Sequence, residues 1–482
     1  MTKAYGNHIG GHWLDPVHAV PNVNPSNISD IIGDYAHSCS SDVDDAVASA
    51  KAAFPAWSRS LPIRRAAILK AASLELEART EELARLLARE EGKTLLEALG
   101  EVARAAQILD FFAGEAVRIS GEVMESLRPG VGIEVTREPI GVIGIITPWN
   151  FPILIPAWKI ASALAFGNCV VFKPAELVPA CAHALTEILV RAGLPAGVLN
   201  LVMGEGPTVG ARICEHRDVA AVTFTGSVPT GRRIAAACIG GETMKKIQLE
   251  MGGKNPLIVL DDADLGVAVE AAVDGAFFGT GQRCTASSRL IVTSSIHDRF
   301  VAALRERLAG LVVDDALKAG TQIGPVVDRV QFERDLSYIE IGRQEGAKLI
   351  AGGECLLREH EGFYLAPALF VEAALEMRIC REEIFGPVAA VIRVQDYDEA
   401  LAVANATPFG LSSGICTTSL KYATHFKRNS DAGMVKVNLS TSGVDFHVPF
   451  GGRKDSSYGP REQGRYAREF FSQVKTAYQL SL

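Results

Sequence analysis

The stretch that decides the fold is residues 141–176, GVIGIITPWNFPILIPAWKIASALAFGNCVVFKPAE. It begins with an apolar run at residues 142–147 and ends near another at 169–172, and both runs have the length of buried strands. Residues 158–166 between them have a helical pattern. A strand, a helix and a second strand in this order are typical of parallel sheets covered by helices, so the sequence predicts an α/β fold.

The same alternation extends along most of the chain. Residues 198–202, 221–224 and 257–260 are further expected strands, and residues 180–191 form another expected helix, so a doubly wound parallel sheet follows. Residues 43–119 are rich in Ala, Leu, Glu and Arg and predict a helical segment. A second α/β region is expected over residues 261–437, with strands at 290–292, 349–350, 389–394 and 433–437.

Composition excludes several classes of protein. The 482 residues are 48% hydrophobic and 22% charged, which is typical of an ordinary globular protein of two or three domains. A formal net charge of −8 argues against a nucleic-acid partner. The start lacks a signal-peptide pattern and no apolar run reaches about 18 residues, so we expect a cytoplasmic protein without a membrane partner. Nine scattered cysteines without metal-ligand spacing predict free thiols and no metal site.

Two glycine-containing turns follow expected strands. Gly204 and Gly206, with Gly210 after them, lead into a helix, and the turn from Phe224 to Ser227 does the same. Backbone N–H groups at a helix N-terminus bind phosphate, although one such turn is as readily a plain tight turn. Two together favour a dinucleotide site.

Three side chains predict chemistry at a second site. Cys284 follows Arg283 at a glycine-bounded turn, and a neighbouring cation would stabilise a thiolate; the plain alternative is a core cysteine at a helix end. Glu250 lies among apolar residues and glycines, so we expect partial burial and an elevated pKa suited to a general base. Asn150 lies in a proline-framed turn, where a fixed amide can donate to an oxyanion or serve only the turn.

Seven short motifs occur in a fixed order. They are PWNFP at 148–152, KPAE at 173–176, FTGS at 224–227, EMGGK at 250–254, GQRC at 281–284, EEIFGP at 382–387 and PFGG at 449–452. Together they closely resemble the aldehyde dehydrogenase superfamily across nearly the whole chain. The resemblance implies that fold: a Rossmann-type cofactor domain, an α/β catalytic domain and a small β oligomerisation element.

The resemblance also implies roles for individual residues. Cys284 resembles the nucleophile that forms a thiohemiacetal, and the side chain of Asn150 with the backbone N–H of Cys284 resembles the oxyanion hole. Glu250 resembles the base that activates water to hydrolyse the thioester, and Lys159 matches a lysine near the proton path. The implied reaction is NAD(P)-dependent oxidation of an aldehyde to a carboxylic acid.

For the cofactor, the resemblance implies contacts from both halves of the chain. The expected residues are Thr147, Trp149, Lys173, Glu176, Gly206, Gly210, Phe224, Ser227, Glu383 and Phe385. Lys173 and Glu176 match the pair that holds the adenosine ribose, and a carboxylate there suits hydroxyls better than a 2′-phosphate. NAD is therefore favoured, and NADP remains the alternative.

The substrate is expected to be a small acidic aldehyde. Arg283 next to the nucleophile can anchor a carboxylate, or it can make a structural ion pair or lower the thiol pKa. The expected substrate-binding residues are Arg283, Phe151, Trp158, Ser440 and Phe450.

The C-terminal region narrows the range of expected aldehyde substrates. His447, the pair Ser456–Ser457 where many members have Ser-Gly, and the YGPR stretch at 458–461 resemble the bacterial subgroup that oxidises 2-oxoglutarate semialdehyde (2,5-dioxopentanoate). Succinate or glutarate semialdehyde is the alternative. Ser162 departs from the family's usual proline and is expected to affect helix geometry.

Two competing functions remain. They are a coenzyme A-acylating dehydrogenase, against which Glu250 counts, and a non-catalytic protein on the same fold.

The expected division of the chain follows from the resemblance. It places a dinucleotide-binding domain at 1–118 and 140–251, a catalytic domain at 252–447, and an oligomerisation element at 119–139 and 470–482. Residues 474–480 alternate like an edge strand, so a homodimer or homotetramer is expected.

Overall fold

The largest sheet of the computed structural model, which describes residues 3–481, has eight strands in the order β20-β12-β11-β8-β9-β10-β2-β3. The five inner strands are parallel: β12 (Lys246–Met251), β11 (Val219–Gly226), β8 (Val142–Ile146), β9 (Cys169–Lys173) and β10 (Leu199–Leu201). The outer strands β20 (Ser457–Tyr458), β2 (His8–Ile9) and β3 (His12–Trp13) are antiparallel. Strands β8 and β9 confirm the fold expected from residues 141–176.

Helices pack on this sheet in two groups, and both share one hydrophobic core with it. One group contains α1 (Ser40–Ser58), α7 (Ala211–Glu215) and α8 (Val228–Gly240); the other contains α2 (Pro62–Ala78), α3 (Thr80–Glu91), α4 (Leu95–Ala116), α5 (Leu154–Ala165) and α6 (Pro179–Arg191). The helical segment expected at 43–119 is thus confirmed as four helices. Thr94 caps α4, because its hydroxyl accepts from the backbone N–H of Glu97 and the Glu97 carboxylate accepts from that of Thr94.

A second sheet has seven strands in the order β15-β16-β17-β14-β13-β18-β19. They are β13 (Pro256–Val259), β14 (Arg289–Thr293), β15 (Lys348–Ala351), β16 (Ala368–Val371), β17 (Val388–Val394), β18 (Ser412–Cys416) and β19 (Met434–Val437), all parallel except β15. The helices are α9 (Leu265–Ala276), α10 (Ser294–Ala309), α11 (Arg329–Gln344), α12 (Arg378–Arg381), α13 (Tyr397–Asn405) and α14 (Leu420–Asn429). Two separate apolar clusters contain side chains of this sheet.

Some elements differ from the expectation. The run at 257–260, grouped with the first sheet's strands, belongs to the second sheet, while β12 with Glu250 was not expected as a strand. The sequence also did not indicate β16, β18 or the N-terminal strands, among them the sheet of β1 (Ala4–Tyr5), β5 (Asn27–Ala36) and β4 (Ala19–Asn24). The domain boundaries themselves stay a prediction.

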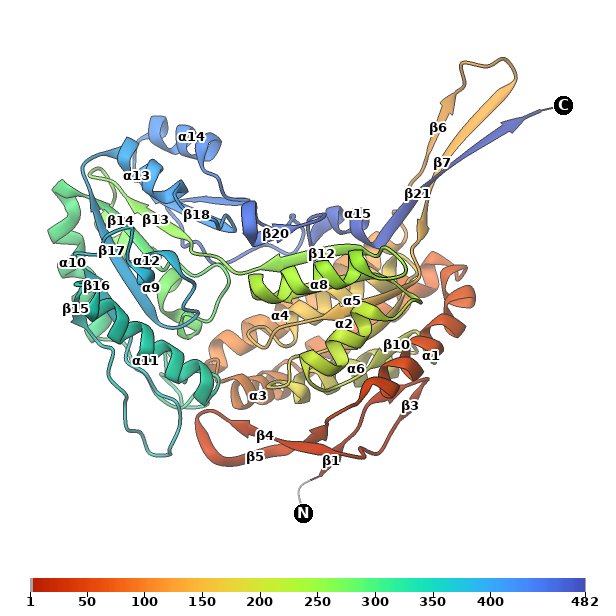
Figure 1. Cartoon of the computed structure of the whole chain (residues 1–482), viewed down its shortest axis with the longest axis horizontal. Helices are drawn as coiled ribbons and strands as arrows, with labels where there is room; N and C mark the ends of the chain where they lie inside the picture. Colours follow the sequence, from red (N-terminus) through yellow and green to blue (C-terminus); the bar gives the residue numbers. More distant parts are fainter. Residues whose placement is uncertain (1–2, 482) are drawn as a thin grey trace.

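A three-stranded arm extends from the body of the molecule (Figure 1). Its strands are β6 (Glu122–Glu125), β7 (Val131–Pro139) and β21 (Ser472–Leu480), and β21 pairs with β7 in antiparallel register from Ser472 opposite Pro139 to Leu480 opposite Val131. The helix α15 (Arg468–Phe471) leads into it. Within residues 3–481, no helix is long and apolar enough to cross a membrane, and no cluster of His, Cys, Asp and Glu is placed to hold a metal ion.

Candidate active site

Cys284 lies in a loop that follows α9 and a short helical turn, Phe278–Gly281. Its carbonyl oxygen accepts a hydrogen bond of 2.8 Å from Nδ2 of Asn255, which fixes the loop against the start of β13. Gly281 has a φ of +65°, and a Cβ there would lie 2.2 Å from the carbonyl oxygen of Gly386. Only glycine therefore allows the cysteine loop to approach the loop that carries Glu383 and Phe385.

Asn150 is buried beside this loop. Its Nδ2 donates to the carbonyl oxygen of Gln282 at 2.9 Å, which places the amide next to the cysteine loop. The backbone carbonyl oxygen of Asn150 accepts a hydrogen bond of 2.6 Å from Nζ of Lys93. Lys93 in turn pairs with Glu101, whose carboxylate also accepts from the backbone N–H groups of Ile153 and Leu154. The buried ion pair of Lys93 and Glu101 therefore holds the backbone of the Asn150 turn in place.

Glu250 points from β12 into the protein and is buried. Its Oε1 accepts a hydrogen bond of 2.7 Å from the Ser457 hydroxyl, and that hydroxyl accepts one of 2.6 Å from the backbone N–H of Gly452. Burial raises the pKa of Glu250 well above its usual range, and the charge of Glu462 raises it further. The burial and elevated pKa expected from the sequence are confirmed.

Lys159 lies in a buried polar network near Glu250. Its Nζ donates to the Thr223 hydroxyl at 2.7 Å and forms a short ion pair with Glu462, which also accepts from Nε1 of Trp158 at 2.8 Å. The network is buried, and burial lowers the pKa of Lys159. Sequence reasoning missed Glu462; its place shortly after the PFGG motif was the only available signal.

Cys284 lines two cavities. One of about 650 Å³ is also lined by Trp149, Asn150, Ser227, Glu383 and Phe385, which are expected cofactor or catalytic residues. The other, of about 620 Å³, is lined by Phe151, Trp158 and Phe450, which are expected substrate residues, and by Arg104. The thiol therefore lies where the cleft lined by expected cofactor residues and a largely apolar pocket meet.

The expected ribose-binding pair lies at the end of β9. Nζ of Lys173 contacts Oε1 of Glu176 at 2.8 Å, and the same oxygen accepts from the backbone N–H of Gly206 at 2.6 Å. Gly206 and Gly210 bound a single helical turn that precedes α7. This carboxylate therefore joins the end of β9 to the glycine turn.

The other expected cofactor residues fall into two groups. The hydroxyl of Ser227 caps α8, and the rings of Trp149 and Phe385 meet edge to face at 5.3 Å. Phe224 is buried beneath the turn at Gly226, and Thr147 is buried with its hydroxyl unpaired. Neither Phe224 nor Thr147 is among the described residues that line the cleft.

Arg283 points away from Cys284. Its guanidinium contacts Glu97 at 2.6 Å and Asp274 at 3.4 Å, and it donates to the Ser442 hydroxyl at 3.2 Å. Burial raises the pKa of the Cys284 thiol, and the charges of Glu250 and Glu383 raise it further. The expectation that Arg283 stabilises a thiolate is wrong for this structure, because its charge is engaged elsewhere. Ser440 shares a hydrogen bond with Ser442 and lines neither cavity at Cys284.

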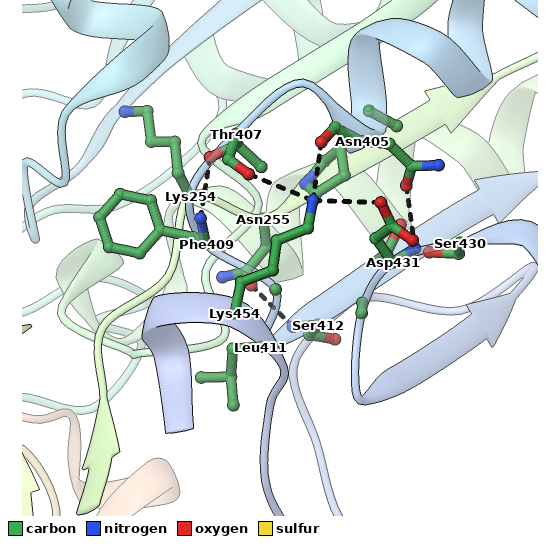
Figure 2. A pocket seen from close by; sticks show the side chains of 15 residues that line it. Lys254, Asn255, Asn405, Thr407, Phe409, Leu411, Ser412, Ser430, Asp431 and Lys454 are labelled. Atoms are coloured by element: carbon green, nitrogen blue, oxygen red, sulfur yellow. Dashed lines mark hydrogen bonds and ion pairs between the residues drawn. The ribbon is translucent and has the colours of Figure 1, made fainter. Parts of the chain in front are cut away.

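A separate cavity lies near the loop that supports Glu250 (Figure 2). In it, Nζ of Lys454 donates to the carbonyl oxygens of Asn405 and Thr407 at 2.8 and 3.2 Å and pairs with Asp431 at 3.2 Å. None of the four expected catalytic side chains, Cys284, Glu250, Asn150 and Lys159, lines this cavity. These contacts hold the segment just before Ser456 and Ser457, so they support the base indirectly.

Comparison with known proteins agrees with this geometry. The sequence model of the aldehyde dehydrogenase family matches residues 13–477. The chain is 45% identical over 480 residues to the alpha-ketoglutaric semialdehyde dehydrogenase of Bacillus subtilis, covering 99% of this chain and 98% of that protein. It is 42% identical to the 2,5-dioxopentanoate dehydrogenase of Saccharolobus solfataricus, with 95% of each covered.

Solved structures show the same relationship. The crystal structure of an NAD-dependent aldehyde dehydrogenase from Sinorhizobium meliloti matches with a TM-score of 0.96 at 35% identity, covering 99% of this chain and 95% of that one. The chain therefore belongs to the aldehyde dehydrogenase family, has its mixed α/β fold, and is an NAD(P)-dependent aldehyde dehydrogenase.

Proposed function

We propose that this enzyme oxidises 2-oxoglutarate semialdehyde to 2-oxoglutarate, with Cys284 as the nucleophile. The observation that carries the mechanism is that Cys284 lines both the cleft of Trp149 and Phe385 and the pocket of Trp158 and Phe450. The sulfur adds to the aldehyde carbon in the pocket, and the thiol proton passes to the former carbonyl oxygen. The Asn150 amide, adjacent to the loop, donates to that oxygen while it carries negative charge.

Glu250 acts in the second half of the reaction. It accepts a proton from the water that attacks the thioester, so a C–O bond forms, the C–S bond breaks and the sulfur leaves protonated. Burial raises the pKa of Glu250, which makes its carboxylate a stronger base toward that water. Lys159 and Glu462 lie beside it and provide a buried path for that proton.

The cofactor residues fit a nicotinamide dinucleotide. Lys173 and Glu176 would hold the ribose hydroxyls, and the N-terminus of α8 at Ser227 would hold the pyrophosphate. Trp149, Glu383 and Phe385 would surround the nicotinamide end. When bound, the dinucleotide would accept the hydride that the thiohemiacetal loses on becoming a thioester, and the hydroxyl proton of the thiohemiacetal would leave to solvent. Glu176 at the ribose end favours NAD, because its charge repels a 2′-phosphate.

Two lines of support favour an acidic semialdehyde. The named relatives at 42–45% identity act on alpha-ketoglutaric semialdehyde, or 2,5-dioxopentanoate, according to their names. The pocket at Cys284 is apolar along Phe151, Trp158 and Phe450 but has an arginine in its lining, which suits a short chain that ends in a carboxylate.

We also propose that the arm of β6, β7 and β21 joins subunits into a homodimer or homotetramer. The arm exposes large apolar side chains: Val123, Met124, Leu127, Val474, Tyr478 and Leu480. A projecting sheet with apolar side chains on it is covered in most stable proteins.

Formation of NADH tests the function. Wild-type enzyme with NAD and 2-oxoglutarate semialdehyde should release free 2-oxoglutarate without coenzyme A, and Cys284→Ser should be inactive with its fold unchanged by circular dichroism. Succinate and glutarate semialdehyde in parallel assays show which chain length gives the highest kcat/KM. The proposed mechanism would be refuted if product release required coenzyme A or if Cys284→Ser kept full activity.

A further inference from the structure

The pocket on the substrate side of Cys284 contains one charged side chain among the described residues that line it. That side chain is Arg104, on the exposed face of α4. The remaining lining is apolar or uncharged, with Thr225, Thr285 and Gln463 as its polar side chains. A ligand in this pocket therefore meets the thiol and a single cation.

Arg104 is available for a ligand. It forms no hydrogen bond or ion pair with another residue in the described part of the chain. Its charged neighbour is Lys436, whose Nζ donates to the carbonyl oxygen of Gly443. Burial lowers the pKa of Lys436, Asp445 acts in the opposite sense, and the charge of Arg104 lowers it again. Arg104 also lines a neighbouring polar cavity, whose other charged side chains are already paired with one another: Lys93 with Glu101, and Arg283 with Glu97 and Asp274.

Arg283 is the obvious alternative, and its environment counts against it. The guanidinium already contacts Glu97 and Asp274, so two carboxylates surround one cation. Its side chain is only 14% exposed, and it lines a neighbouring polar cavity rather than the pocket at Cys284. A substrate carboxylate would have to compete with Glu97 and Asp274 for this guanidinium, which disfavours binding there.

We propose that Arg104, and not Arg283, binds the carboxylate of the acidic aldehyde and thereby sets the enzyme's preference for it. The inference rests on the proposed function, because it names the residue that recognises the acid group of that substrate. A guanidinium pairs with a carboxylate through two parallel N–H donors, and all its donors are free here. Binding the far end of the substrate also orients the aldehyde carbon toward the sulfur of Cys284.

The test compares kcat/KM for 2-oxoglutarate semialdehyde with that for pentanal, a neutral aldehyde of equal length. Arg104→Met should lower the ratio of the two values at least tenfold while pentanal oxidation stays within twofold of wild type. Arg104→Lys should restore part of the ratio. Arg85→Met is the matched control, because Arg85 is an exposed helical arginine that lines none of the cavities at Cys284, and it should change nothing.

The outcomes distinguish a failure of the inference about Arg104 from a failure of the proposed substrate. If wild type prefers the acid but Arg104→Met keeps the ratio within twofold, the inference about Arg104 is overturned and the proposed substrate stands. If wild type shows no preference for the acidic aldehyde, the proposed substrate fails first. Inhibition by glutarate gives an independent readout: Arg104→Met should raise its inhibition constant at least tenfold, and an unchanged constant counts against the inference.

Discussion

Replacing Ser457 with alanine should shift the pH dependence of turnover to higher pH. The Ser457 hydroxyl accepts from the backbone N–H of Gly452 and donates to Oε1 of Glu250, so its proton is directed at the carboxylate. This hydrogen bond favours the charged form of Glu250 and lowers its pKa, against burial and the charge of Glu462, which raise it. Lys159 and Arg461 are the cations that also act on Glu250.

The magnitude follows from the strength of that bond. A hydrogen bond to a charged group contributes about 1.5–3 kcal/mol, and one pKa unit corresponds to about 1.4 kcal/mol. Loss of the Ser457 hydroxyl should therefore raise the pKa of Glu250 by about one to two units. Glu250 is a base only as the carboxylate, so its activity appears as pH rises through its pKa. In the variant, the rising limb of kcat moves up by about one to two pH units, and kcat on that limb falls about tenfold to a hundredfold.

The assay is kcat against pH for wild type, Ser457→Ala and Ser457→Thr, under conditions where thioester hydrolysis limits turnover. Threonine keeps the hydroxyl and should keep the wild-type profile. A profile for Ser457→Ala that superimposes on wild type would refute the reasoning, as would equal shifts in both variants. A uniform loss of kcat at all pH values would mean that Ser457 serves only the local structure.

Three further outcomes are expected. Glu250→Gln should give one burst of NADH per active site and then stall, because only hydrolysis of the thioester needs the base, and steady turnover at the wild-type rate would exclude that role. Glu176→Gln should lower the NAD-to-NADP ratio of kcat/KM about tenfold by removing the charge that repels a 2′-phosphate, and an unchanged ratio would contradict the assignment. Deletion of residues 472–482 should give a smaller oligomer in light scattering, because β7 loses β21, one of its two neighbouring strands. An unchanged mass would show that the arm is not needed for assembly.

Much of the first sheet could be predicted because its strands are continuous apolar runs. Residues 142–146 and 169–173 are buried on both faces, and such runs need no knowledge of the rest of the chain. The strand with Glu250 was missed, although its residues alternate between polar and apolar. Its buried polar side chains are satisfied by distant partners: Gln248 accepts from the Thr223 hydroxyl and donates to the backbone carbonyls of Pro460 and Arg461, and Glu250 accepts from the Ser457 hydroxyl.

The N-terminal strands show a different limit. β2 and β3 have two residues each and exist because β2 pairs with β10 about 190 residues later. Strand β18 contains Ser412, Ser413 and Gly414, which have little strand propensity, and is formed by its neighbours β13 and β19. Pairing between distant segments, rather than local preference, decides these elements.

The site residues also divide into those found by local motifs and those whose surroundings come from distant segments of the chain. Motifs placed Cys284, Asn150 and Glu250 in the sequence, and the fold brings them to one centre. Arg283 was misjudged because adjacency in the chain suggested a shared environment, whereas its partner Glu97 lies 186 residues earlier. Arg104 was overlooked because an arginine on an exposed helix face ordinarily contacts only solvent.

The helix α4 carries two independent functions within one turn. Glu101 faces inward and holds the backbone of the Asn150 turn, while Arg104, three residues later, lines the pocket. Arg104 makes no hydrogen bond or ion pair with Glu101 or Lys93 in the described part of the chain, so a change of Arg104 leaves intact the contacts that hold the Asn150 turn. If Arg104 selects the aldehyde as proposed, single substitutions at this position alter the substrate preference and spare the residues that hold Asn150 in place.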